Sequence, residues 1–186
     1  MIKSLYPQFQ YWSLHGSLYM LGDTHFGDKD CLYMDPFWVN PEKQVEIINN
    51  IVGKHDIFVH LGDVGDIDYM SKIKAGYKIL IMGNHDKKSD CRKVFDEIYT
   101  GPLFIADRIL LSHEPITGLP WCLNIHGHDH NNMEKYENGC KHLNLAANVC
   151  DYTPVNLKKI IKDGILSDVK GIHRATIDSA KEKMYV

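Results

Sequence analysis

Residues that can bind metal ions and move protons occur together in the stretch Gly83-Asn84-His85-Asp86. It offers an amide oxygen, a titratable imidazole and a carboxylate directly after an apolar run, residues 77–82. That run is short, rich in large and β-branched residues and bounded by Gly76 and Gly83, so it predicts a buried strand. Because open α/β sheets bind their ligands at the carboxyl ends of strands, we expect these polar side chains to lie at such an edge.

The same arrangement recurs along the chain. Five expected strand ends are followed by residues that can bind a metal: Asp23 with His25, Asp63, Asn84, His113, and His128 with His130. Buried carboxylates and imidazoles without partners are costly, so core packing explains five recurrences poorly. The mixture of oxygen and imidazole ligands suits two divalent transition ions rather than calcium, and Asp63, in the middle of the order, could bridge them. Two such ions stabilise the attacking and leaving oxygens at phosphorus, with a bridging hydroxide as the nucleophile.

These stretches resemble the motifs of the calcineurin-like metallophosphoesterases. The family's motifs DxH, GD, GNH(D/E), H and GHxH are matched in order by Asp23-Thr24-His25, Gly62-Asp63, Gly83-Asn84-His85-Asp86, His113 and Gly127-His128-Asp129-His130. The resemblance implies an α/β fold, a four-layer α/β/β/α sandwich of two mixed sheets with flanking helices. It also implies hydrolysis of phosphomonoesters or phosphodiesters at a dinuclear site.

The resemblance further assigns roles to individual residues. One metal would be held by Asp23, His25, Asp63 and His130, and the other by Asp63, Asn84, His113 and His128. His85 would be the catalytic histidine, which is not a ligand, and Asp86 would hold it in place. The two divalent ions are expected among Mn, Fe, Zn, Ni and Co, with Mn favoured in vitro.

The spacing of apolar residues predicts the elements that position these motifs. Asn40 and Pro41 indicate the N-cap and first residue of a helix that ends before Gly53, and its place between two strands predicts parallel pairing. Further helices are expected over residues 67–74, around Val94, Phe95 and Ile98, and from Thr153-Pro154 to Gly164. Hairpins are expected at Asp107-Arg108 and Asn138-Gly139. Residues 1–16 suggest only an edge strand or an arm, and the tail after Asp168 a short strand or a frayed end.

Length and composition set the class of protein. A chain of 186 residues favours a single domain, 1–186, and the formal net charge of -3 argues against strong sequence-wide attraction to nucleic acid or anionic membrane. The five cysteines are scattered and predict reduced thiols. The N-terminal stretch lacks the apolar core of a signal peptide, and no run of about 18 apolar residues occurs, so we expect a cytoplasmic protein without a membrane partner.

Two classes of function remain open, a phosphate-ester hydrolase and a non-catalytic metal-binding scaffold, and the presence of His85 favours the hydrolase. Within the enzymes, a nuclease is the alternative to a phosphodiesterase or phosphatase for small, nucleotide-like substrates. The basic residues Lys87, Lys88, Arg92 and Lys93 are diluted by aspartates and are expected on a solvated face. Nucleic acid is therefore possible but not favoured, and the oligomeric state stays open.

The loops between the motifs are short, which predicts an open site without a cap domain. Substrate would then stack on nearby aromatic residues such as Phe26, Phe37 or Trp121. His60 and His126 alternate with ligand positions, so we expect them to support ligands or the core rather than to bind metal.

Overall fold

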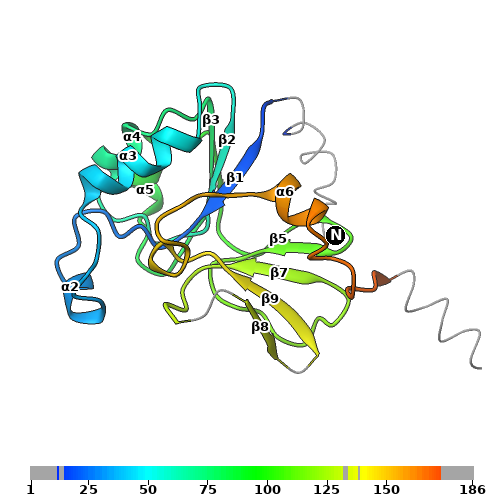
Figure 1. The fold of residues 1–186 in the computed structure, drawn as a ribbon. Coiled ribbons are helices and arrows are strands. Elements are labelled where there is room, and N and C mark those ends of the chain that lie inside the picture. Colours follow the sequence, from blue (N-terminus) through cyan, green and yellow to red (C-terminus); the bar gives the residue numbers. More distant parts are fainter. Residues whose placement is uncertain (1–11, 13–14, 132–133, 138, 173–186) are drawn as a thin grey trace, which may run out of the picture.

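The structure, a computed structural model, describes residues 12, 15–131, 134–137 and 139–172. Within these residues the chain forms two five-stranded sheets (Figure 1). The first has the order β10-β1-β2-β3-β4, formed by Val155–Asn156, Leu18–Leu21, Ile57–His60, Tyr77–Ile81 and Glu97–Tyr99. β1, β2, β3 and β4 are parallel, and β10 adds an antiparallel edge next to β1.

The second sheet has the order β5-β6-β7-β9-β8, formed by Leu103–Ala106, Ile109–Leu111, Leu123–His126, Cys140–Asn144 and Glu134–Glu137. β6, β7 and β9 are parallel, while β5 and β8 are antiparallel edges. Both predicted hairpins are confirmed by the pairs β5–β6 and β8–β9. Asn138 itself lies outside the described residues.

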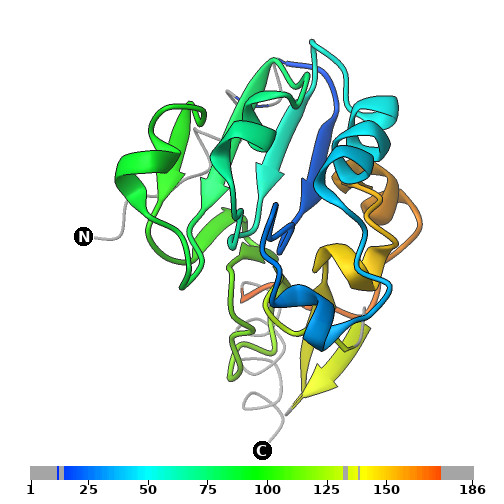
Figure 2. The same ribbon diagram turned by 90° about the vertical axis from the view of Figure 1, so that its left-hand side faces the viewer.

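The helices flank the first sheet. Helices α3 (Pro41–Ile51), α4 (Ile67–Ser71) and α5 (Lys88–Cys91) lie on the side of the first sheet that faces away from the second (Figures 1 and 2). The short helices α2 (Cys31–Met34), η1 (Ala147–Cys150) and α6 (Leu157–Lys162) lie in the connections. The predicted start of α3 is confirmed, because the Asn40 side chain accepts a hydrogen bond from the amide of Lys43 and Pro41 is its first residue.

Two predicted helices are wrong in position. Ile98 does not belong to a helix: it lies in β4, opposite Leu80 of β3, and the helix of this connection is the earlier α5. Pairing to the edge of the sheet overrides the helical spacing of the apolar residues here. α6 begins after Asn156 rather than at Thr153-Pro154, since the Asn156 side chain caps it by accepting from the amide of Lys159.

One hydrophobic cluster contains buried residues of both sheets, including Val59 of β2, Ile81 of β3, Leu111 of β6 and Ile125 of β7. The sheets are also joined through the backbone, because Gly22 donates to the carbonyl of Leu145 and accepts from the amide of Ala147, at 2.8 and 2.9 Å. The predicted α/β architecture of two mixed sheets with flanking helices is confirmed. Among the described residues no helix is long and apolar enough to cross a membrane. Most of the expected N-terminal arm and of the tail after Asp168 lies outside the described residues.

Candidate metal centre

The five motifs meet where the two sheets meet. Asp23, Asp63 and Asn84 follow the carboxyl ends of the parallel strands β1, β2 and β3. His113 and His128 follow the ends of β6 and β7, which are parallel in the second sheet. The amide of Gly127 donates to the carbonyl of His113, at 3.0 Å, so these two loops lie side by side. Parallel pairing therefore brings together residues that are far apart in sequence.

Three ligand candidates form a first cluster: Asp23, His25 and His130 each offer an atom within 4.8 Å of the others. The His130 Nε2 atom lies 3.9 Å from Asp23 Oδ1. The ring is oriented by Asn148, whose Oδ1 accepts from His130 Nδ1 at 2.8 Å and whose Nδ2 donates to the His130 carbonyl at 3.1 Å. Because Nδ1 carries the proton, Nε2 keeps its lone pair for a metal.

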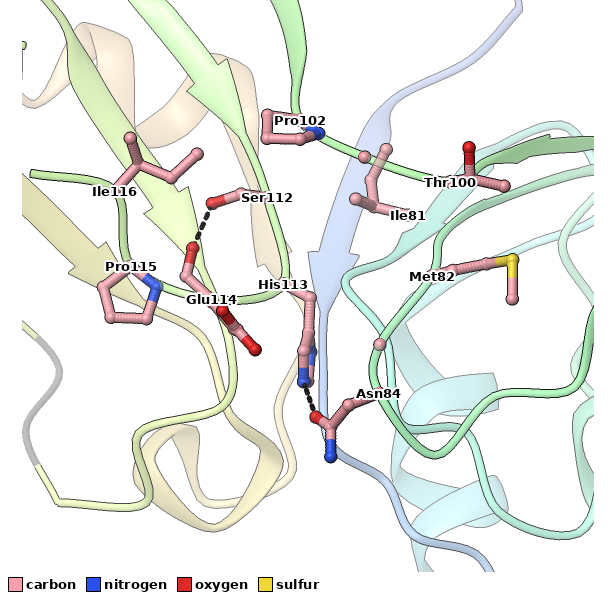
Figure 3. Close-up of a pocket in the computed structure, with 12 residues that line it drawn as sticks. Ile81, Met82, Asn84, Thr100, Pro102, Ser112, His113, Glu114, Pro115 and Ile116 are labelled. Carbon is pink, nitrogen blue, oxygen red and sulfur yellow. Dashed lines mark hydrogen bonds between the residues drawn. The ribbon is translucent and has the colours of Figure 1, made fainter.

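A second cluster contains Asp63, His113 and His128. His113 donates from Nδ1 to the carbonyl of Leu61, at 2.9 Å, which leaves its Nε2 atom facing the site. This Nε2 atom lies 2.9 Å from Asn84 Oδ1 (Figure 3) and 3.1 Å from His128 Nδ1. An amide oxygen and two imidazole nitrogens thus converge on one point, an arrangement that a single cation satisfies.

Asp63 connects the two clusters. Its Oδ2 atom lies 3.8 Å from His25 Nε2 and 3.4 Å from His113 Nε2, while Oδ1 accepts the backbone amide of His85 at 2.9 Å. Asp23 is held in the same way, because its Oδ2 accepts the amide of His128 at 2.8 Å. Each carboxylate thus has one oxygen fixed by a neighbouring loop and one that faces the imidazoles.

The residues of the first cluster fit a cation. Asp23 is fully buried, and its Oδ1 atom has no hydrogen-bond partner among the described residues. Burial raises the pKa of Asp23 to about 7, because the lost hydration outweighs the charge of His113 and the hydrogen bond from the His128 amide, which both lower it. A buried carboxylate oxygen without a partner is costly, and a bound divalent ion would remove that cost.

The second cluster binds a proton in the absence of a cation. Burial would lower the pKa of His113, but its hydrogen bond to Asp63 and the charges of Asp23 and Asp63 raise it to about 9. Burial would raise the pKa of Asp63, but hydrogen bonds from the His113 ring and the His85 amide, with the charges of His113 and His25, lower it to about 2. A proton and a metal therefore compete for the same place.

The backbone of the ligand loops is strained. Positive φ angles of 52°, 40°, 54° and 65° occur at Asp23, His25, Asp63 and His128, none of which is glycine. Such conformations cost on the order of 1–3 kcal/mol each and cluster at functional sites. Close packing adds a further demand, because a Cβ atom at Gly83 would collide with the Asp63 carboxylate and one at Gly127 with that of Asp23. The glycines of these motifs are required for the aspartates to reach the site.

Asp86 does not hold His85, which corrects the expected role. Its carboxylate accepts three backbone amides instead, from Asp63 and Gly83 through Oδ2 (3.0 and 2.8 Å) and from Val64 through Oδ1 (2.9 Å). These three hydrogen bonds hold the loop after β2 against the loop after β3. Asp86 thereby positions Asp63, the residue that connects the two clusters.

His85 lies beside the clusters rather than within them. Its exposed ring has its centroid 5.8 Å from that of His25. His60 and His126 are buried, as expected for support residues, and burial lowers their pKa values to about 3 and about 4. His60 lies 3.0 Å from the Thr24 hydroxyl and accepts the amide of Gly62, so it joins the loops after β1 and β2.

One of the three aromatic side chains expected beside the substrate, that of Phe26, is not available. Phe26 is buried and packs against Tyr69, so it cannot stack on a substrate. Phe37 is 86% exposed. Trp38 lies next to the first cluster, with its ring centroid 6.0 Å from that of His25 and 5.7 Å from that of His130.

One contribution lay outside the motifs. Asn148, which orients His130, follows the end of β9, so a sixth strand end with a polar residue was the available signal. The basic residues after His85 are exposed as expected, and Lys93 pairs with Asp90 at 3.2 Å. None of the five cysteines, all of which the structure describes, forms a disulfide, and all five are buried.

Comparisons with known proteins give matches to solved structures only. No protein-family model matches the chain, and no curated protein matches it. A protein of unknown function from Aquifex aeolicus matches with a TM-score of 0.63 at 26% identity, over 78% of this chain and 98% of that chain. YfcE, a phosphoesterase from E. coli, gives a TM-score of 0.44 at 17% identity, over 69% of this chain and 78% of that chain. A novel archaeal phosphodiesterase gives a TM-score of 0.43 at 19% identity, over 69% of this chain and 82% of that chain.

Nearly the whole length of the Aquifex protein shares the fold of this chain. The two phosphoesterases are too distant for their activities to be transferred to this chain. The resemblance drawn from the five motifs therefore rests on the chain itself, where every motif is intact and all of them meet at one place.

Proposed function

We propose that this chain is a calcineurin-like metallophosphoesterase, a hydrolase of small phosphate esters that works with two divalent transition ions. The single observation that supports this best is the position of Asp63 Oδ2, which lies within 4 Å of an imidazole nitrogen of each cluster. One oxygen that faces two ligand sets is what a bridging ligand requires. Asp23 supports the same proposal, because its buried Oδ1 atom has no hydrogen-bond partner among the described residues and is available to a metal ion.

The ligand sets follow from the two clusters. Asp23, His25, Asp63 and His130 would hold one ion, and Asp63, Asn84, His113 and His128 the other. When bound, the ions would supply an activated water and neutralise the charge of the phosphate. The protein would keep the ligands in place through the amides of His85 and His128 and through Asp86.

His85 is the group available to move a proton. Its ring is exposed, lies next to His25 and has no hydrogen bond to the described residues that would hold it away from substrate. It would donate a proton to the leaving oxygen, or stabilise the charge that develops there. An exposed imidazole next to the ligand clusters favours a hydrolase over a non-catalytic scaffold.

The proposal is tested with protein that is stripped of metal and reloaded with Mn²⁺. Loaded protein should hold close to two ions per chain and hydrolyse bis-p-nitrophenyl phosphate or p-nitrophenyl phosphate, while stripped protein should not. Asp63→Asn should lose both metal and activity, whereas the exposed control Asp163→Asn should keep both. A fully active protein with one tightly held ion would contradict the dinuclear centre.

The substrate class is tested separately. We propose small esters rather than nucleic acid, because the exposed basic residues near the site are interspersed with aspartates. Values of kcat/KM for 2',3'-cyclic AMP and for a single-stranded oligonucleotide should favour the small ester. Dominant cleavage of the oligonucleotide would instead establish a nuclease.

A further inference from the structure

A cavity of about 330 Å³ adjoins the second ligand cluster. Its lining includes Asn84 and His113, so a phosphate ester bound at the cluster would have this cavity directly beside it. Figure 3 shows the two walls: Met82 and Thr100 on the side of the first sheet, and Glu114 on the side of the second. The volume lies at the lower end of the range for small-molecule sites, which suits one small group rather than a polymer.

On the side of the second sheet, the buried side chain of Asn124 holds the lining loop in place. Asn124 of β7 donates to the Ser112 hydroxyl at 2.8 Å and accepts the amide of Ile116 at 2.7 Å. The Ser112 hydroxyl in turn donates to the carbonyl of Glu114 at 2.6 Å. The loop that carries Glu114 is therefore fixed to the sheet on both sides, and the cavity is formed before any ligand binds.

Glu114 is the acidic residue of the lining. No Lys or Arg is among the residues that line the cavity, all of which are described, and Glu114 contributes a carboxylate. Its side chain extends toward the side of the cavity where His113 and Asn84 lie (Figure 3). An anionic group placed next to Glu114 would meet its negative charge with no Lys or Arg of the lining to balance it, whereas an amine or a hydroxyl group could donate to Glu114.

We infer that this cavity binds the alcohol portion of the phosphate ester and selects a small amine-bearing or neutral alcohol over one that carries a second anionic group. The inference rests on the proposed function, because the phosphate would sit at the ligand clusters. Met82, Pro102 and Ile116 add apolar surface for the carbon skeleton of the alcohol. Glu114 is then a specificity residue rather than a metal ligand.

Three esters with the same two-carbon skeleton test the selection: O-phosphoethanolamine, 2-hydroxyethyl phosphate and phosphoglycolate. With Mn²⁺-loaded protein, kcat/KM should fall in that order, by about tenfold from the amine to the acid, the scale of one charge pair at a partly exposed site. Glu114→Gln should flatten the series and Glu114→Lys should reverse it. Glu46→Lys, an equal change of charge on the exposed surface of α3, should leave the order unchanged. An order that is the same in wild type and Glu114→Lys would overturn the inference.

A binding experiment separates this inference from the proposed function. In metal-free protein, titration with ethanolamine should shift the backbone amide signals of Thr100, Gly101, Glu114 and Ile116, and Glu114→Lys should weaken these shifts. Glu46→Lys should leave them unchanged. Shifts confined to other parts of the chain, or equal shifts in wild type and Glu114→Lys, would contradict the cavity as the site. Failure of all three esters to react, with the amide shifts intact, would instead count against the proposed phosphoesterase.

Discussion

The Asp63 carboxylate binds a backbone amide with one oxygen and faces the metal-ligand candidates with the other. Oδ1 is fixed by the amide of His85, and Oδ2 is left to face His25 and His113. The positive φ of Asp63 points the side chain in this direction, at a cost that structure elsewhere must offset. The clamp by Asp86 on the amides of Asp63, Val64 and Gly83 supplies part of that compensation.

His85→Ala should lower kcat by about 100-fold or more, the scale of a lost general acid. The metal content should stay at the wild-type value, because the ring lies outside both clusters and the backbone amide that holds Asp63 is kept. Elemental analysis and steady-state kinetics check the two parts. His55→Ala, at an exposed histidine, is the matched control. If metal is lost in proportion to activity, His85 is a ligand and the proposed role is wrong.

Asp86→Ala should weaken metal binding by about 10- to 100-fold, as expected when the support of a ligand is removed. It leaves three backbone amides without their acceptor, so metal-free protein should also lose about 1–3 kcal/mol in its free energy of unfolding. Metal titration and urea unfolding measure the two effects. A lower kcat with unchanged metal affinity would show that Asp86 acts through His85 after all.

At the scale of the elements, the strand ends do most of the positioning. The runs before Gly22, Gly62 and Gly83 are short, apolar and bounded by glycine, which is why β1, β2 and β3 could be predicted from sequence. Their parallel pairing followed from the helical connections, and it places the motif residues at one edge.

Other features depend on contacts that sequence spacing does not reveal. Ile98 has the spacing of a helical residue, yet the open edge beside β3 pairs with it and makes β4. The carboxylate of Asp86 could equally have bonded to the adjacent imidazole, and only the meeting of two loops shows that it accepts amides. Asn148 lies outside every motif and acts because η1 brings it to His130.

Gly83→Ala should abolish binding of the two ions that share Asp63 as a ligand. The added Cβ atom would collide with the Asp63 carboxylate and amide, so the loops after β2 and β3 would have to separate. Gly101→Ala is the matched control, because a Cβ atom there meets nothing within 4 Å and needs no unusual backbone conformation. Isothermal titration with Mn²⁺ distinguishes the two variants. Equal affinities would mean that the loops can move apart without cost.

At the scale of the whole molecule, the two sheets share one core and meet at the ligand clusters. Two aspartates and several histidines are thus buried at the junction of the sheets, where their charges influence the stability of the entire chain. Metal ions would bind there only to the folded chain, so folding and metal binding are coupled.

Metal-free protein should lose stability as the pH rises from about 6.5 to about 9. The pKa of His113 is raised to about 9 in the folded chain, so its stabilising proton is fully present below its ordinary value of 6.5 and is lost as pH rises through 9. Asp23, whose pKa is raised to about 7, acts in the same direction over the lower part of this window. The lowered pKa values of His60 and His126 matter only on the acid side of 6.5. Each group contributes at most about 1.36 kcal/mol per pH unit to the change in the free energy of unfolding.

Thermal unfolding of EDTA-treated protein measures this loss of stability, and Mn²⁺-loaded protein should not share it, because the ions displace these protons. Rising stability of metal-free protein between pH 6.5 and 8.5 would show that His113 is not protonated at the junction of the sheets.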